Sequence, residues 1–253
     1  MSRSARTGIL RLRAGLRGEI RILGIRDTPA TLRALAPKLT AADRHAAHTL
    51  RSPTRRRSFL LGCALLRIAL RECTGTAPGR AQLQLRRNRR PLHRPAARGA
   101  LALSVSHAGG WVIVAVRRGA VSGHRVGIDI EHADRRVQPG LDRRMPWAHA
   151  SEVAAVETRA GHGQRIVRWT LVESALKADG RGLPGLGALV ANAAPRNGTV
   201  AMTMTLPPQH RILARRLSGL PPPLVGAVAL ARPRARPRAR PWAQPEGDQE
   251  PSR

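Results

Sequence analysis

Three short apolar runs follow one another in the middle of the chain, and helical patterns flank them on both sides. The runs at 100–105, 111–116 and 126–131 have the length and composition of strands. Arg55–Leu70 before them and residues 164–178 after them carry apolar side chains at helical spacing. This order of elements predicts a mixed fold, α+β or α/β, and does not by itself settle the topology.

Other segments carry signals of the same kinds. Thr40 and Asp43 form a cap-like pair inside the helical pattern of Thr31–Leu50. The sequence SHAGG at 106–110 predicts a turn between the first two central strands, and the polar, Gly/Pro-containing residues 75–100 predict a loop. The remaining expected elements are a strand at Ile20–Ile25, a helix at 149–160, and strands at 188–192, 198–206 and 223–230.

These patterns divide the chain into four parts. We expect a ragged extension over residues 1–18, an N-terminal half over 19–118, a C-terminal half over 119–230, and a disordered tail over 231–253. The tail alternates Arg with Pro or Ala and offers no face that could pack. It is therefore either a loose polyanion-binding arm or a segment without function.

A large excess of positive charge limits the classes of partner. The chain has 45 Lys and Arg residues against 15 Asp and Glu, a net charge of +30. Such a surface attracts nucleic acid, phosphorylated cofactors or acidic proteins. However, all but two of the basic residues are arginine, Tyr is absent and Phe occurs once, a bias typical of a GC-rich gene. The charge thus has two explanations, selection for an anionic partner and mutational drift toward arginine.

The cysteine content and the apolar runs bear on the cellular location. Cys63 and Cys73 show neither metal-type nor CxxC spacing, and two cysteines do not indicate a disulfide framework. We therefore expect a cytoplasmic protein. No run of about 18 apolar residues occurs, so no membrane span is expected. The Arg-rich first residues superficially resemble a transit peptide, but they lead directly into the first strand pattern.

The run VGIDIE at 126–131 places two of the few carboxylates one residue apart. In a strand, Asp129 and Glu131 share a face, while Val126, Ile128 and Ile130 pack on the opposite face. Two adjacent carboxylates repel each other unless a cation or basic groups lie between them. Carboxylate oxygens suit Mg²⁺. The alternative is an edge strand with a solvated acidic face.

A second chemical signal lies about forty residues downstream, in WTLVESALKADGRGL at 169–183. On a helix, Trp169, Glu173 and Lys177 form one stripe. A Glu four residues before a Lys is also an ordinary stabilising helix pair. Yet Lys is rare in this chain, and a compact ammonium suits a point contact to phosphate. The following Asp-Gly-Arg-Gly sequence predicts a glycine C-cap.

Two further features could contact anions. Ser106 and His107 precede Gly109 and Gly110, so the expected turn would offer a hydroxyl, an imidazole and backbone N–H groups. A plain hairpin turn explains the same residues. No GxSxG motif accompanies the pair, so a hydrolase triad is not indicated. Basic clusters at Arg55–Arg57 and 86–91 are either solvated surface or phosphate contacts.

Taken together, these motifs resemble those of the 4′-phosphopantetheinyl transferases. The ordered series is a basic loop before Pro91, SVSHAGGW, VGIDIE, and WTLVESALKADGRGL. The resemblance runs from about Ile20 to Leu183 and more loosely to about residue 230. It is greatest to the larger, monomeric, surfactin-synthetase-activating class. This resemblance implies an α+β fold of two similar α/β halves related by a pseudo-twofold axis, with the active site in the cleft between them.

The resemblance also implies an activity. These enzymes move the phosphopantetheine arm of coenzyme A to a serine of an apo acyl or peptidyl carrier protein, in fatty-acid, polyketide or nonribosomal-peptide biosynthesis. They need Mg²⁺ and release 3′,5′-ADP. The implied metal ligands are Asp129, Glu131 and Glu173, the implied catalytic residues are Glu173 and Lys177, and the implied coenzyme A contacts are Arg56, Arg57, Arg90, Ser106, His107 and Lys177.

The chain departs from the family pattern at three points. Arg90 stands where the family usually has Lys before Pro, Val172 stands where it usually has Lys before the helix Glu, and Cys63 stands where relatives often carry a longer polar residue. A degenerate, low-activity member of the family is therefore one alternative. A basic nucleic-acid-binding protein is a second, although four Trp, one Phe and no Tyr offer few stacking platforms. A Mg²⁺-dependent phosphate-ester hydrolase is the third.

Overall fold

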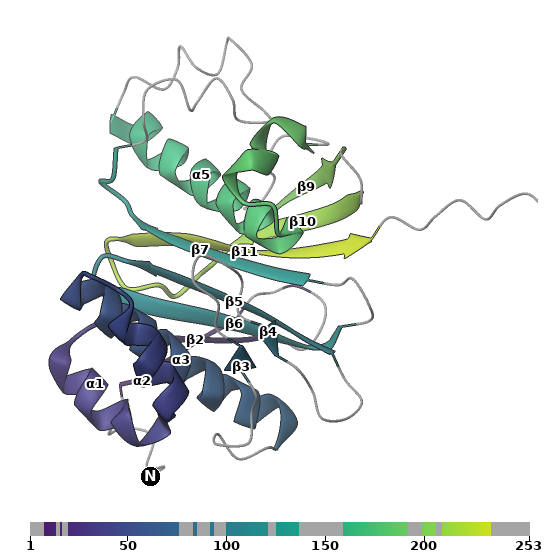
Figure 1. The fold of residues 1–253 in the computed structure, drawn as a ribbon. Coiled ribbons are helices and arrows are strands. Elements are labelled where there is room, and N and C mark those ends of the chain that lie inside the picture. The colour runs from purple at the N-terminus through teal and green to yellow at the C-terminus, as the bar shows by residue number, and fades with distance from the viewer. Residues whose placement is uncertain are drawn as a thin grey trace, which may run out of the picture.

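The protein is described here from a computed structural model as four layers, in which two β-sheets pack face to face and helices cover their outer sides. The described residues are 8–13, 16, 20–75, 83–84, 92–93, 100–120, 125–136, 159–191, 199–205 and 209–233. Figure 1 shows helices α1, α2 and α3 on the outer side of one sheet and helix α5 on the outer side of the other. The expected α+β class agrees with this arrangement of mixed elements, whereas the pseudo-twofold relation stays a prediction.

The N-terminal part of the chain forms a four-stranded sheet and its helices. The strand order is β1-β2-β6-β5, with antiparallel neighbours throughout. A separate short hairpin is made by strands β3 and β4. The elements are β1 (Leu10–Leu12), β2 (Ile20–Arg26), α1 (Pro29–Leu35), the 3-10 helix η2 (Ala36–Lys38), α2 (Ala41–His48), α3 (Pro53–Thr74), β3 (Leu83–Gln84), β4 (Leu92–His93), β5 (Ala100–Ala108) and β6 (Trp111–Ala120).

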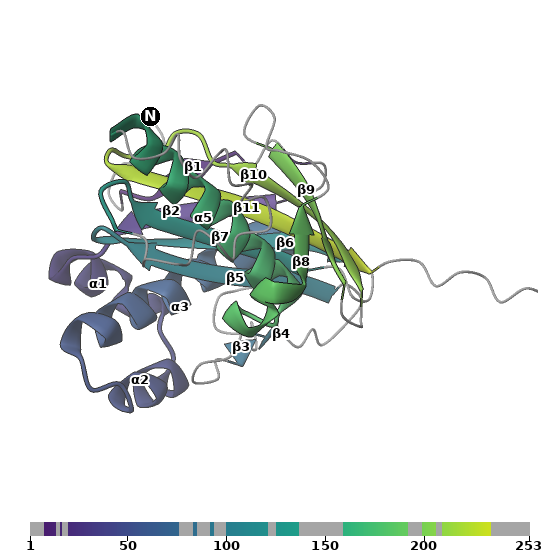
Figure 2. The same cartoon turned by 90° about the horizontal axis from the view of Figure 1, so that it is seen from above.

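The C-terminal part of the chain forms a five-stranded antiparallel sheet with the order β7-β11-β10-β9-β8. Strand β7 therefore lies at an edge, and α5 covers the outer face over β7 and β11 (Figure 2). The elements are β7 (Arg125–His132), α5 (Arg159–Asp179), the 3-10 helix η4 (Leu183–Ala188), β8 (Leu189–Ala191), β9 (Thr199–Met204), β10 (His210–Arg216) and β11 (Leu224–Pro233).

Three apolar clusters hold these layers together. One lies between α3 and the four-stranded sheet, where Leu61, Leu65 and Val114 are fully buried. The second lies between the two sheets and contains Ile113 of β6 and Ile128 of β7. The third lies between α5 and the five-stranded sheet. Because alternate residues of a strand face opposite sides, the central strands β2, β6 and β11 each contribute to two of these clusters.

Helix α3 begins and ends at clear capping signals. The Ser52 side chain accepts a hydrogen bond from the Arg55 backbone N–H, Pro53 stands at the first helical position, and Gly75 ends the helix with a φ of 69°. The predicted helix at Arg55–Leu70 is confirmed and extends at both ends. Among the residues predicted to share its inner face, Cys63, Leu66 and Leu70 are buried.

The predicted helix at Thr31–Leu50 is two helices. Pro37 has no backbone N–H and falls in the 3-10 turn η2, where regular α-helix stops. Thr40 then starts α2 through a capping box with Asp43, so the expected cap is confirmed at a different helix start. Asp43 also accepts hydrogen bonds at 3.0 Å from Nε and Nη2 of the buried Arg67, which ties α2 to α3.

The strand predictions are largely confirmed, with five corrections. The predicted loop at 75–100 contains the short paired strands β3 and β4. Ser106 and His107 lie in strand β5, and the turn of the hairpin is at Gly109 and Gly110. Residues Leu10–Leu12, inside the expected N-terminal extension, pair with β2 because Leu10 and Leu12 reach the core between the sheets. Strand β10 has no counterpart among the predictions. The expected tail begins inside β11, and residues 234–253, like most of the expected helix at 149–160, lie outside the described residues.

One close contact fixes the distance between α5 and the five-stranded sheet. A Cβ atom on Gly127 would lie 2.0 Å from the Ser174 carbonyl oxygen and 2.4 Å from the Ala178 backbone nitrogen. Both atoms belong to the helix backbone, so neither can move without moving α5. Glycine at this position therefore lets the helix approach the β7 backbone directly.

None of the helices in the described ranges is long and apolar enough to cross a membrane.

We expect Gly127→Ala to destabilise the protein by about 1–3 kcal/mol or more, because the new methyl group overlaps the α5 backbone. Gly187→Ala is the matched control, since a Cβ there has no atom within 4 Å. Its free energy of unfolding should change by less than about 0.5 kcal/mol. Denaturant unfolding of both variants measures the difference, and equal stabilities would contradict the contact.

A second stability prediction concerns Arg117 of β6, which is 6% exposed and points between the sheets. Its Nε and Nη1 atoms are buried without a hydrogen-bond partner among the described residues. Burial lowers the pKa of Arg117, and the positive charge of Arg232 lowers it further.

Arg117→Met should therefore raise the free energy of unfolding by about 1–3 kcal/mol, because it removes buried donors that lack acceptors. The same change at the exposed Arg211 should alter stability by less than about 0.5 kcal/mol. Chemical denaturation compares the two variants, and a destabilised Arg117→Met protein would refute the prediction.

Candidate metal centre

Strand β7 presents its two carboxylates to α5 and its apolar residues to the other sheet. Ile128 and Ile130 are fully buried in the cluster between the sheets, so the predicted alternation is confirmed. Asp129 is 2% exposed and Glu131 is 5% exposed. The alternative of a solvated acidic face on an edge strand is therefore wrong, because the edge strand is covered by both α5 and β5.

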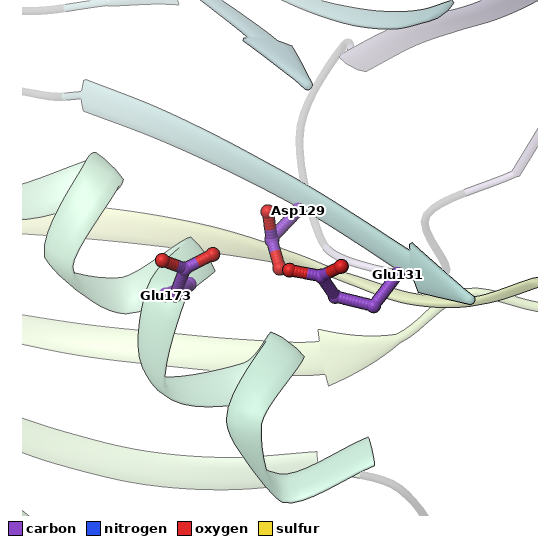
Figure 3. Close-up of side chains that lie close together, drawn as sticks. All are labelled: Asp129, Glu131 and Glu173. Atoms are coloured by element: carbon purple, nitrogen blue, oxygen red, sulfur yellow. The ribbon is translucent and has the colours of Figure 1, made fainter. Parts of the chain in front are cut away.

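Helix α5 brings a third carboxylate to the same place. Glu173 and Lys177 are one turn apart on its side that faces β7, while Trp169 packs into the apolar cluster beneath the helix. The predicted C-cap is confirmed, since Gly180 has a φ of 98° and its N–H donates to the Leu176 carbonyl at 2.9 Å. Oxygen atoms of Asp129, Glu131 and Glu173 lie within 4.8 Å of one another (Figure 3).

Two cations neutralise part of this negative charge. The Lys177 ammonium donates to Asp129 Oδ1 at 2.7 Å, and the Arg135 guanidinium forms an ion pair with Glu131. Arg135 stands just beyond the end of β7, four residues after its partner. Its side chain is 55% exposed, so this second cation covers the cluster from the solvent side.

The third carboxylate, Glu173, has a raised pKa. Burial, and then the negative charges of Asp129 and Glu131, raise the pKa of Glu173 to about 8, although Lys177 opposes the shift. Burial also raises the pKa of Glu131, an effect that the hydrogen bond from Arg135 only partly offsets. In the absence of a further cation, the cluster at pH 7 therefore keeps a proton on Glu173.

The residues at this cluster fit a hard divalent cation. Three carboxylates supply the oxygen ligands that Mg²⁺ prefers. Asp129 Oδ2 is buried and accepts no N–H or hydroxyl hydrogen bond from the described residues, and the Asp129 carboxylate shares the proton of Glu173 instead. A cation among these oxygens would replace the proton of Glu173 and relieve the mutual repulsion of the three groups.

Ser106 of β5 completes the cluster from the opposite sheet. Its hydroxyl donates to Asp129 Oδ1 at 3.0 Å and accepts from Lys177 Nζ at 3.2 Å. The predicted turn at this position is wrong because residues 100–108 continue the strand, paired with β6 up to Ala108 and Trp111. Ser106 therefore contacts Asp129 from within strand β5. The next residue, His107, points to the opposite face of that strand, where it is exposed.

Two of the expected arginine contacts, Arg56 and Arg57, lie near the start of α3. That helix packs on the outer face of the four-stranded sheet. Arg56 donates to the carbonyl oxygens of Leu50 at 2.6 Å and Arg51 at 3.1 Å, and Arg57 forms an ion pair with Asp27. Arg90 lies outside the described residues.

Part of the chain that contains this cluster resembles a known protein family. Residues 125–214 match the model of the 4′-phosphopantetheinyl transferase superfamily. The matched segment runs from β7 to β10 and contains all three carboxylates and Lys177. This part of the chain is therefore similar to a family of transferases that use coenzyme A. A search of the curated proteins finds no match to the chain.

Three contributors to the site were not found from the sequence. Arg135 could have been predicted as an ion-pair partner of Glu131, because it stands four residues after it in a chain with few acidic residues. Gly127 and the contact of Ser106 with Asp129 gave no such signal, because their roles depend on which element packs against them. Val172, where the sequence departs from the family pattern, is a residue of α5 whose side chain is fully buried in the apolar cluster between α5 and the five-stranded sheet.

We expect divalent cation binding to release about one proton at pH 7, because an ionised Glu173 is required as ligand. Since the pKa of Glu173 is raised to about 8, cation affinity should increase as the pH rises toward that value and then level off. Calorimetric titration with Mg²⁺ in buffers of different ionisation enthalpy counts the protons.

The matched variant is Glu173→Gln, which keeps the size of the side chain and cannot release a proton. Its cation affinity should be lower and nearly independent of pH between about 6 and 9. A wild-type protein that binds Mg²⁺ with no proton release would contradict the raised pKa.

Proposed function

We propose that the protein transfers the 4′-phosphopantetheine arm of coenzyme A to a serine of an apo acyl or peptidyl carrier protein in a Mg²⁺-dependent reaction. The observation that carries this proposal is the convergence of Asp129, Glu131, Glu173 and Lys177 inside a segment that matches the transferase superfamily. Phosphoryl transfer needs charge neutralisation and positioning more than covalent chemistry by the protein. Three carboxylates beside a lysine suit both tasks.

In this reaction the serine oxygen attacks the coenzyme A phosphorus that carries the pantetheine arm. The new oxygen–phosphorus bond forms as the bond to 3′,5′-ADP breaks, and the serine proton leaves. Asp129, Glu131 and Glu173 would hold Mg²⁺, which supplies positive charge to the pyrophosphate oxygens. Glu173, once ionised, would take the serine proton directly or through water.

Lys177 would contact the pyrophosphate. The ammonium has three N–H donors, and Asp129 and Ser106 accept hydrogen bonds from two of them. Among the described residues, the third donor has no acceptor. The side chain is 33% exposed, which leaves the ammonium open to a ligand. This donor would stabilise the charge that develops on the leaving phosphate.

The remaining contacts to coenzyme A come from the family resemblance. Arg56, Arg57, Arg90 and His107 would bind its phosphates, Arg56 and Arg57 with guanidinium donors that form no hydrogen bond with the described residues. We propose a monomer that works in the cytoplasm, with two halves related by a pseudo-twofold axis and the active site between them. A basic enzyme surface would also speed encounter with an acidic carrier protein, in a salt-dependent way.

The other candidate functions have less support. A nucleic-acid-binding protein has no use for three converging carboxylates, and the family match does not favour it. A phosphate-ester hydrolase could use the same cluster, and it would release product from coenzyme A without a carrier protein. A low-activity transferase differs only in rate, so a measured turnover separates it.

We expect the protein to label an apo carrier protein with a fluorescent coenzyme A only when Mg²⁺ is present. Glu131→Ala and Lys177→Ala should each lower the rate at least about 10²-fold, since each removes a charge that acts on the transition state. Mass spectrometry of the carrier and release of 3′,5′-ADP are the measurements.

Matched controls exist for both variants. Asp134→Ala removes a carboxylate that is 85% exposed near the end of β7, and Lys38→Ala removes the chain's other lysine, which is exposed. Both should keep the wild-type rate. Full activity in the Glu131 and Lys177 variants would refute the assigned roles, and 3′,5′-ADP release without a carrier would indicate the hydrolase.

A further inference from the structure

The two sheets meet at their edges through serine side chains. Strand β5 is the edge of the four-stranded sheet, and β7 is the edge of the five-stranded sheet. The Ile128 N–H donates to Ser104 Oγ at 3.0 Å, and the Ile130 N–H donates to Ser106 Oγ at 3.3 Å. Hydroxyl groups of β5 thus accept the hydrogen bonds of the β7 edge.

Ser106 differs from Ser104 in what else it contacts. Its hydroxyl also donates to Asp129 Oδ1 at 3.0 Å and accepts from Lys177 Nζ at 3.2 Å. The single O–H donor is used by Asp129, and the oxygen accepts from Lys177 and Ile130. The residue is 6% exposed, so the hydroxyl is enclosed by these three partners.

We infer that Ser106 is a positioning residue for the metal centre and does not itself contact coenzyme A phosphate. This inference rests on the proposed metal site and replaces the phosphate contact that the resemblance implies for this serine. The hydroxyl holds Asp129 Oδ1 and the Lys177 ammonium in one orientation. Asp129 Oδ2 accepts no N–H or hydroxyl hydrogen bond from the described residues, so a cation that displaces the Glu173 proton can bind it.

The chemistry of ligand positioning supports the inference. Carboxylates that bind metals are oriented by hydrogen bonds from neighbouring groups, and loss of such a partner typically lowers metal affinity about 10–100-fold. A buried hydroxyl with its only donor committed to a carboxylate has no donor left for a phosphate. Ser106 is therefore suited to orient Asp129 and unsuited to bind an anion.

Three variants test this role. Ser106→Ala removes all three contacts, Ser106→Thr keeps a hydroxyl, and Ser104→Ala removes only the corresponding bond to the β7 backbone. The measurements are Mg²⁺ affinity by calorimetry without substrate, the melting temperature, and the kcat and KM for coenzyme A in carrier labelling.

We expect Ser106→Ala to bind Mg²⁺ about 10–100-fold more weakly and to lose kcat, with KM for coenzyme A nearly unchanged. Ser104→Ala should keep the wild-type affinity, and Ser106→Thr should restore most of it. Both serine-to-alanine variants should lower the melting temperature, because each leaves one β7 N–H without its acceptor, and the loss should be at least as large in Ser106→Ala, which also removes the contacts to Asp129 and Lys177.

Several results would overturn the inference. These are unchanged Mg²⁺ affinity in Ser106→Ala, an equal loss in Ser104→Ala, a Thr variant as weak as Ala, or a raised KM for coenzyme A with unchanged affinity. Absence of Mg²⁺ binding by the wild-type protein would overturn the metal site and this role together. Tight Mg²⁺ binding without carrier labelling would instead overturn only the proposed transfer.

Discussion

The direct contact between the β7 backbone at Gly127 and the backbone of α5 is the constraint on which the site depends. Ser174 and Ala178 leave no space for a side chain at this position. Asp129 and Glu131 lie on the same face of β7, two and four residues after Gly127. Glu173 and Lys177 lie on the helix beside that contact. The approach of the two backbones therefore sets the distance between the carboxylates of the strand and the charged residues of the helix.

That short distance creates a balance of charge that only a cation relieves fully. Lys177 pairs with Asp129, Arg135 pairs with Glu131, and Glu173 keeps a proton because its pKa is raised to about 8. A protonated Glu173 is a poor base and a poor ligand. A divalent cation held by the three carboxylates would favour the ionised form of Glu173, which is the form that could accept a proton.

The sequence predicted the elements of the site because their periodicity is strong. Strand β7 alternates apolar and acidic residues, and α5 carries its charged residues one turn apart. Strand β10 escaped prediction because its inward residues are His210, Ile212 and Ala214, of which only one is a large aliphatic residue. His210 is buried, and its Nδ1 atom forms a 2.6 Å hydrogen bond with Asp179 Oδ1. The sequence around His210 does not predict a partner that lies 31 residues away. The turn at Ser106 was misplaced for a related reason, since two glycines mark a turn but not how far the preceding strand extends.

The serine contacts between β5 and β7 have a mechanical consequence. A continuous backbone ladder would lock the two sheets into one rigid register, whereas hydroxyl groups on rotatable side chains hold them by single points. A small slide or change of tilt between the sheets would first displace the hydroxyl of Ser106. Because that oxygen is hydrogen-bonded to Asp129 and Lys177, the relative placement of the two sheets is transmitted to the charged groups of the carboxylate cluster.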